Sequence, residues 1–264
     1  MILGTVTHSL LFVGALILLS AAITWLMIRV PIIDQPNLRS SHGQPVPRSG
    51  GVAIVVTTYV GFIVLFVLGD QFSIVENELL VLAVGAAIIA AAGFLDDINI
   101  LDSFKSKLIL QVLASVTVLF SGVLIDRVSL PFIGAIGLDW WGYPVTLLWV
   151  LGLTNIINFM DGLDGLAAGT ASVVTAIFGL IAISQGAAFA SVMGFVLCAA
   201  CAGFCIFNFP RAKIFMGDVG SQFLGFVLAV LGVMAAGQDT APISVFAIPL
   251  LFFHFIFDTV FTFC

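Results

Sequence analysis

Three groups of acidic residues interrupt an otherwise apolar chain, and glycines accompany each group. Asp96 and Asp97 are adjacent. Asp161 and Asp164 lie three residues apart, and Asp218 follows a glycine. Like charges that lie close together cannot all stay ionised without a counter-ion. Carboxylate oxygens suit Mg²⁺, which usually binds proteins through one or two carboxylates together with phosphates. The three groups therefore predict a metal site.

Basic residues alternate with these acids along the chain. The first acidic pair is preceded by Arg48 and followed by Lys105 and Lys107. Shortly before Asp218 come Arg211 and Lys213. Arginine and lysine side chains bind phosphate groups directly. Acids that hold a metal ion and bases that hold phosphates are the usual combination for chemistry on a pyrophosphate.

A simpler interpretation of the acids is structural. A single aspartate at a helix end is most often a cap or a solvated terminus, and adjacent acids there are often the same. Asn155 and Asn158 can likewise serve as hydrogen-bond donors between membrane helices. Three groups on one face, each beside a glycine that permits close approach of a ligand, favour a functional site for the set as a whole.

Composition identifies the solvent in which these residues work. The 264 residues are 61% hydrophobic and 8% charged, whereas a soluble domain carries about 25% charged residues. The composition therefore excludes a soluble protein. A net charge of −6 and the lack of any Lys/Arg run also argue against a nucleic-acid partner.

Nine segments are long enough to cross about 30 Å of hydrocarbon. They must be helices, because each segment has to satisfy its own backbone hydrogen bonds in lipid. We therefore predict an all-α fold, a polytopic bundle of about nine transmembrane helices that forms a single domain over residues 1–264. The predicted spans are 9–29, 51–69, 79–95, 107–125, 143–158, 166–184, 188–208, 219–236 and 242–261.

The basic residues predict how this bundle lies in the membrane, because short cytoplasmic loops carry an excess of Lys and Arg. Nine spans place seven of the eight basic residues on one face and only Arg127 on the other. We therefore expect an outer N-terminus and a cytoplasmic active face that holds the three acidic groups. The seven residues are Arg29, Arg39, Arg48, Lys105, Lys107, Arg211 and Lys213.

Four ordered blocks, 34–51, 93–111, 155–166 and 208–221, resemble the polyprenyl-phosphate N-acetylhexosamine-1-phosphate transferases, which are membrane enzymes of the glycosyltransferase family 4 type. The resemblance extends over essentially the whole chain, and the order of all four blocks on one predicted face makes it specific. The first two blocks resemble the branch that starts surface glycans more than the peptidoglycan translocase branch.

The resemblance implies a reaction. An N-acetylhexosamine-1-phosphate passes from a UDP-sugar to undecaprenyl phosphate, UMP leaves, and the lipid-linked pyrophosphoryl sugar initiates synthesis of O-antigen or a related surface polysaccharide. Direct attack by the lipid phosphate is favoured over an aspartyl intermediate, because this phosphate is already an anion and Mg²⁺ can neutralise the developing charge. The implied cofactor is Mg²⁺, for which Mn²⁺ can substitute. The implied setting is the bacterial inner (cytoplasmic) membrane, and a homodimer is compatible with it.

The resemblance also implies roles for individual residues. Asp96, Asp97 and Asp161 are the catalytic candidates, and Asp218 and Asp97 are the candidate metal ligands. The remaining candidates are Asn155, Asn158, Asp164, Asn208 and Phe215 for the nucleotide and sugar, and Arg48, Lys105 and Lys107 for phosphates.

The end of the chain departs from the family pattern. Family members carry a His-x-His motif in a cytoplasmic loop beyond the helix that matches 242–261. This sequence stops at Cys264, where that loop is expected to begin. We therefore expect a chain truncated before the His-rich loop and the last helices.

The main alternative is a transporter that uses its carboxylates to couple protons or cations, since acids within membranes often mark ion pathways. That class predicts carboxylates near mid-span and discontinuous helices, whereas these acids lie at the ends of the predicted spans. A CDP-alcohol phosphotransferase shares the Asp-Gly pairs around Asp161 and Asp164. The Ala-Arg element that this class requires does not follow them.

Overall fold

The computed structural model describes residues 2–30, 32–34, 45–67, 76–101, 103–130, 132, 134–237 and 243–263. These residues form mainly α-helices, which confirms the predicted all-α class. The helices are α1 (Ile2–Met27), α2 (Gly51–Val67), α4 (Glu76–Asp97), α5 (Phe104–Phe120), α6 (Gly142–Met160), α7 (Leu166–Gln185), α8 (Ala188–Asn208), α9 (Gly217–Ala236), α10 (Ala247–Leu251) and α11 (Phe253–Phe263).

Six of the described helices are long and apolar enough to cross a membrane: α1, α4, α6, α7, α8 and α9. The chain is therefore a multi-span membrane protein. Two further predicted spans, 51–69 and 107–125, appear as the 17-residue helices α2 and α5. At 1.5 Å per residue, each reaches about 25 Å.

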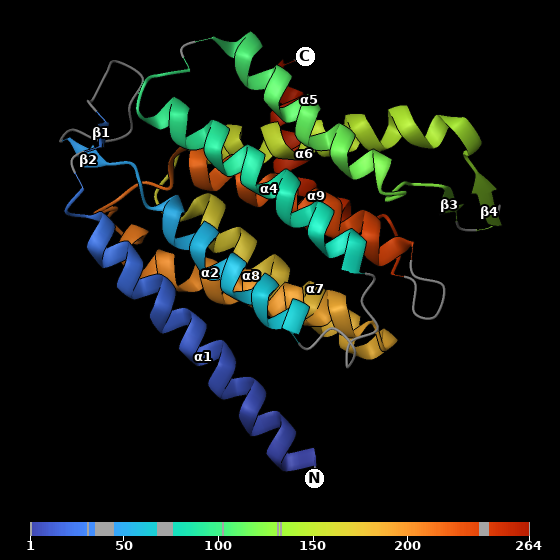
Figure 1. Cartoon of the computed structure of the whole chain (residues 1–264), viewed down its shortest axis with the longest axis horizontal. Helices are drawn as coiled ribbons and strands as arrows, with labels where there is room; N and C mark the ends of the chain where they lie inside the picture. The colour runs from blue at the N-terminus through green and yellow to red at the C-terminus, as the bar shows by residue number, and fades with distance from the viewer. Residues whose placement is uncertain are drawn as a thin grey trace.

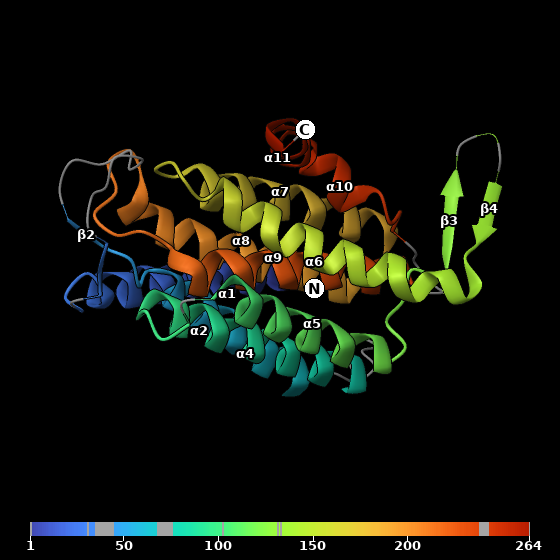
Figure 2. The same ribbon diagram turned by 90° about the horizontal axis from the view of Figure 1, so that it is seen from above.

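The last predicted span is wrong as a single helix. The segment predicted over 242–261 forms two short helices, α10 and α11, with a turn at Phe252 between them. Figure 2 views α11 along its axis while the long helices are seen from the side, so α11 lies across the bundle. Phe252 and Phe255 are fully buried. Hydrophobicity cannot distinguish one long helix from two short ones that bury the same apolar side chains.

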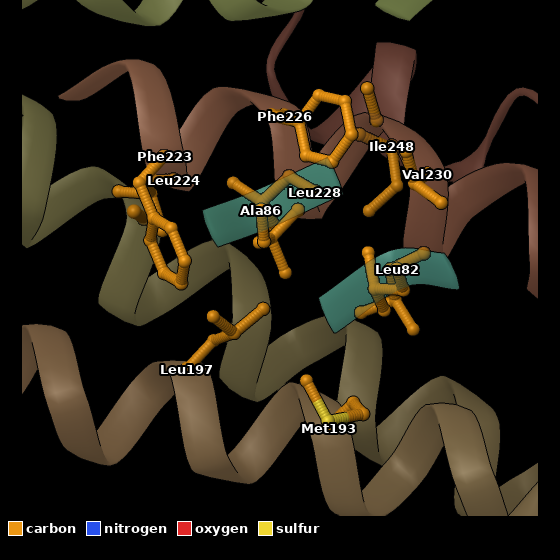
Figure 3. Packing of buried hydrophobic residues seen from close by; sticks show 14 of the residues in the cluster. Leu82, Ala86, Met193, Leu197, Phe223, Leu224, Phe226, Leu228, Val230 and Ile248 are labelled. Atoms are coloured by element: carbon orange, nitrogen blue, oxygen red, sulfur yellow. The ribbon is translucent and has the colours of Figure 1, made fainter. Parts of the chain in front are cut away.

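Helix α9 is the centre of the bundle (Figures 1 and 2). It packs against α2, α4, α6 and α8, and every side chain from Val219 to Ala235 is buried. Around this core, α7 pairs with α8, α1 packs on α8 and α2, and α5 packs on α4 and α6. Figure 3 shows Phe223, Phe226 and Leu228 of α9 meeting Leu82 of α4 and Leu197 of α8. A helix enclosed in this way can be apolar on all sides.

Two short antiparallel ladders, which the sequence did not predict, lie at opposite ends of the bundle (Figure 1). Strands β1 (Ile33–Asp34) and β2 (Val46–Pro47) pair Ile33 with Pro47 and Asp34 with Val46. At the other end, β3 (Arg127–Leu130) pairs with β4 (Gly134–Gly137), with Arg127 opposite Gly137. A short 3₁₀ helix, Asp139–Trp141, leads from this hairpin into α6.

Candidate active site

Four helix ends meet at the end of the bundle that carries β1 and β2 (Figure 1). Helix α4 ends at Asp97, α6 ends just before Asp161, and α9 begins one residue before Asp218. Helix α5 begins after Ser103, whose hydroxyl accepts a hydrogen bond from the Lys105 backbone N–H at 3.3 Å. The fold therefore gathers the predicted acidic groups and the two predicted lysines at one end.

Asp218 receives hydrogen bonds from three other side chains. Its Oδ1 accepts a hydrogen bond from Asn158 Nδ2 at 3.1 Å. Its Oδ2 accepts bonds from Lys107 Nζ at 3.2 Å and from Gln222 Nε2 at 2.6 Å. The carboxylate thus receives donors from α5 and α6 as well as from its own helix, and these donors determine its orientation.

Lys107 joins two of the predicted acids. Its Nζ lies 2.5 Å from Asp96 Oδ2 and 3.2 Å from Asp218 Oδ2, and all three side chains are partly exposed. One positive charge therefore sits between carboxylates from α4 and α9. This arrangement supplies the counter-ion that such a pair of acids requires.

A chain of amide side chains supports this centre from within the bundle. Gln222 Oε1 accepts from Gln111 Nε2 at 2.9 Å, and Gln111 Oε1 accepts from Asn155 Nδ2 at 2.8 Å. Gln111 and Gln222 are buried, with 3% and 2% of their surface exposed. The sequence reasoning assigned no role to Gln222. The available signal was a lone glutamine four residues after Asp218, which puts both on the same face of one helix.

Asp97 has different surroundings from Asp96. Its side chain is 2% exposed, and its two oxygens accept the backbone N–H groups of Asp218 at 3.0 Å and Val219 at 3.1 Å. Arg48 Nε donates to the Asp97 carbonyl oxygen at 3.0 Å. Arg48 also contacts Asn99 Oδ1 at 3.3 Å. The predicted phosphate contact of Arg48 stays a prediction, because in this structure its guanidinium binds the end of α4.

Asp161 completes the acidic cluster. It is partly exposed and follows the last turn of α6, where its backbone N–H donates to the Asn158 carbonyl at 3.3 Å. Partial removal of the Asp161 carboxyl from solvent raises its pKa well above the ordinary value, and the negative charges of Asp218 and Asp97 raise it further. A cation that binds beside Asp161 would stabilise the ionised form of this carboxyl and lower its pKa.

Asp164 and Asn208 connect the two loops beside this cluster. Asp164 Oδ2 accepts the Ala212 backbone N–H at 2.9 Å. Asn208 accepts the Gly165 N–H at 2.8 Å and donates to the Ile214 carbonyl at 2.9 Å. Their predicted contacts with a nucleotide are untested, and in this structure they hold the loops together.

Phe215 and Lys105 complete the set of predicted residues. Phe215 is partly buried, and its backbone N–H donates to the Pro47 carbonyl at 2.7 Å, which ties its segment to β2. Lys105 is exposed at the start of α5. Residues 35–44 of the first block, with Arg39, lie outside the described residues.

The residues present suit a divalent cation. Within the described parts of the chain, no group of three or more His, Cys, Asp or Glu side chains forms a complete metal cage. Mg²⁺ does not require such a cage, since it keeps waters and shares one or two carboxylates with substrate phosphates. The Lys107 ammonium already occupies a position between Asp96 and Asp218 that stabilises a cation. The carboxylates of Asp96 and Asp218 therefore suit a divalent cation, whereas Asp97, which was predicted as a metal ligand together with Asp218, here accepts backbone N–H groups of α9.

Comparisons with known proteins give consistent matches. The profile of glycosyl transferase family 4 matches residues 79–236, which is more than half of the chain. A probable undecaprenyl-phosphate N-acetylglucosaminyl 1-phosphate transferase of Bacillus subtilis is 36% identical over 89% of this chain and 64% of its own length. A decaprenyl-phosphate N-acetylglucosaminephosphotransferase of Mycobacterium leprae is 34% identical over 79% of this chain and 56% of its own length.

A phospho-N-acetylmuramoyl-pentapeptide-transferase of a Synechococcus strain is 41% identical over 50% of this chain and 39% of its own length. These names do not decide between the two branches considered above, and the choice between them stays a prediction. The chain spans less than two thirds of the length of these relatives.

Proposed function

The chain belongs to glycosyl transferase family 4, and from this premise we propose that it transfers an N-acetylhexosamine-1-phosphate from a UDP-sugar to undecaprenyl phosphate. UMP leaves, and the product is a lipid-linked pyrophosphoryl sugar that initiates O-antigen or a related surface polysaccharide. N-acetylglucosamine is the first sugar to test, since it appears in the names of the Bacillus and Mycobacterium relatives. We place the reaction at the cytoplasmic face of a bacterial inner membrane.

The observation that carries the proposal is the contact of Lys107 with both Asp96 and Asp218 at the end of the bundle. These three side chains come from α4, α5 and α9, so the fold assembles them from distant parts of the sequence. Two acids and a base held together supply binding groups for a cation and for a phosphate. A transfer between two phosphate-bearing substrates needs both.

Each residue has a part in this proposal. Asp96 and Asp218 would hold Mg²⁺, which when bound would supply positive charge to neutralise the pyrophosphate of the donor. Lys107, released from the two carboxylates, contacts a substrate phosphate. An oxygen of undecaprenyl phosphate attacks the β-phosphorus of the UDP-sugar, and the bond from this phosphorus to the oxygen that bridges it to UMP breaks. Asn158 and Gln222 keep the Asp218 carboxylate in position throughout.

The transporter alternative predicts carboxylates near the middle of the spans. Asp96, Asp97 and Asp218 instead lie in the last or first turn of their helices, and Asp161 lies just outside α6. This position suits chemistry at a membrane surface, where a lipid phosphate and a soluble nucleotide can meet.

Release of UMP tests the proposal. The protein, reconstituted in lipid, is supplied with undecaprenyl phosphate, Mg²⁺ and a panel of UDP-N-acetyl sugars, beginning with UDP-N-acetylglucosamine. We expect UMP with one donor only, none without the lipid phosphate, and none after a chelator is added. Protein that melts cooperatively but neither releases UMP nor binds UDP-sugars in the presence of Mg²⁺ contradicts the proposal.

A further inference from the structure

Asp96 and Asp97 are neighbours in the sequence, but their carboxylates contact different parts of the molecule. Asp96 faces Lys107, with Oδ2 at 2.5 Å from Nζ. Asp97 turns to the first turn of α9 and accepts the N–H groups of Asp218 and Val219 at 3.0 and 3.1 Å. The sequence alone suggested metal or catalytic roles for both acids.

The first turn of α9 needs a partner of this kind. The first N–H groups of a helix have no acceptor within the helix, and a side chain at the N-cap position usually supplies one. The N-cap residue of α9 is Met216, which makes no side-chain hydrogen bond to the helix. Asp97 therefore supplies the acceptor that the local sequence lacks, and its negative charge lies at the positive end of the helix dipole.

We propose that Asp97 is a positioning residue rather than a metal ligand: it caps α9 from α4 and so fixes Asp218 in the orientation that meets Lys107 and Asn158. Its consequence for catalysis rests on the function proposed above, whereas the capping itself does not. The carboxylates of Asp96 and Asp218 are then the pair left for the metal ion.

Two glycines let α4 and α9 come close enough for this cap. Gly217 has a φ of +71°, and a Cβ there would lie 2.6 Å from Asp97 Oδ2. Gly93 lies one turn before Asp97 on the same face of α4, and a Cβ there would lie 2.5 Å from the Asp218 carbonyl oxygen. Any side chain at either position would push the carboxylate away from the helix end.

Arg48 holds the end of α4 that carries Asp97. Its Nε donates to the Asp97 carbonyl at 3.0 Å and lies 3.8 Å from the Asp97 Oδ1. Its terminal nitrogen reaches the Asp96 carbonyl at 3.3 Å. The last carbonyls of a helix otherwise lack donors, and a cation there is favourable. The capping carboxylate is therefore presented from a fixed helix end.

Hydrogen exchange of the substrate-free protein tests the cap directly. Loss of an N-cap weakens a helix end by an amount that corresponds to about tenfold faster exchange. We expect Asp97→Ala to accelerate exchange of the amides at 218–222 by about this factor. Asp97→Asn keeps only one of the two capping oxygens, so it should accelerate exchange less than Asp97→Ala does. If Asp97→Ala fails to fold, Asp97→Ser provides the comparison, since its shorter side chain cannot reach both N–H groups.

Asp96→Ala is the matched control, since it removes the neighbouring carboxylate without touching the cap. It should leave exchange at 218–222 unchanged. Unchanged exchange in Asp97→Ala, or equal acceleration by Asp96→Ala, overturns the proposal.

Activity provides a second readout that separates positioning from direct participation. If Asp97 acts through the cap, Asp97→Asn retains more UMP release than Asp97→Ala, because asparagine keeps one of the two acceptor oxygens. If Asp97 binds the metal, both variants lose activity equally although exchange in Asp97→Asn is slower than in Asp97→Ala, and the proposal is overturned. Faster exchange in Asp97→Ala together with an inactive unmodified protein refutes only the proposed function.

Discussion

Charged pairs occur at both ends of the bundle, but they are built differently. At the end with the acidic cluster, Lys107 links Asp96 of α4 to Asp218 of α9, and the three side chains are 26%, 16% and 25% exposed. At the other end, Arg127 Nε lies 3.5 Å from the adjacent Asp126, and these side chains are 56% and 60% exposed. The first set joins distant segments where charge is weakly screened, and the second pair is exposed, where ion pairs contribute little.

Exposed aromatic residues also distinguish the hairpin end of the bundle from the end with the acidic residues. Trp140 and Trp141 stack with ring centroids 4.1 Å apart beside the β3–β4 hairpin, and both are exposed. Tryptophan is enriched at the boundary between lipid and water. One end of the bundle thus carries polar side chains that are joined by hydrogen bonds and ion pairs and are suited to chemistry. The other end carries exposed aromatic rings that are suited to contact with the membrane surface.

The largest expected effect comes from Asp218→Asn. This change removes the charge that holds Lys107 and that is expected to bind Mg²⁺. Mutation of a residue that hydrogen-bonds to a metal ligand typically lowers activity about 10–100-fold. Loss of the ligand itself should therefore lower UMP release by more than about a hundredfold. The same change at the opposite end, Asp126→Asn, is the control and should leave turnover near the unmodified rate. Full activity in a folded Asp218→Asn protein would remove the metal assignment.

A smaller loss is expected from Gln222→Met, which keeps the volume but removes the donor to Asp218 Oδ2 and the shorter of the two hydrogen bonds that Gln111 Nε2 donates. We expect UMP release to fall about 10–100-fold, with a higher Mg²⁺ requirement in a titration of turnover against metal concentration. Gln185→Met, at the exposed end of α7, is the matched control. Equal turnover in the two variants would show that the amide chain does not orient Asp218.

Asp161→Asn is expected to raise the stability of the folded protein at neutral pH. Burial and nearby acids raise the pKa of Asp161, so the folded protein holds this proton more tightly than the unfolded chain. The free energy of unfolding therefore falls as the pH rises above the ordinary value of 3.8. In the presence of a chelator, the variant should melt a few degrees higher at pH 7 and at the same temperature near pH 4.

The control for this measurement is Asp139→Asn, because Asp139 is exposed at the opposite end. Its melting temperature should not change with pH relative to the unmodified protein. A gain in Asp161→Asn that is equal at both pH values would refute the electrostatic explanation.

The smallest effect is expected from Asp126→Ala. Exposed ion pairs contribute about 0–1 kcal/mol, so the melting temperature should move by no more than about 2–4 °C. High salt should abolish even this difference, because salt screens exposed charges. A larger loss of stability would show that ion pairs also stabilise the hairpin end, and it would weaken the contrast between the two ends.

Much of this arrangement was predictable from the sequence. Eight of the nine predicted spans correspond to helices, and the family expected from the four blocks is the one that matches. The segment 242–261 was not predictable, because apolar composition reports burial and not whether a helix continues through Phe252. Gln222 was missed because a single polar residue in an apolar helix does not reveal its partner.

The sequence by itself determined that the chain belongs in a membrane and which residue types can bind a metal ion and phosphates, since hydropathy and the chemistry of carboxylates are local properties. Only the tertiary structure decided which carboxylate does what. Asp96 and Asp97 are identical residues at consecutive positions, and they differ because the helix turns their side chains in different directions. One meets a lysine from α5, and the other meets the bare N–H groups at the start of α9.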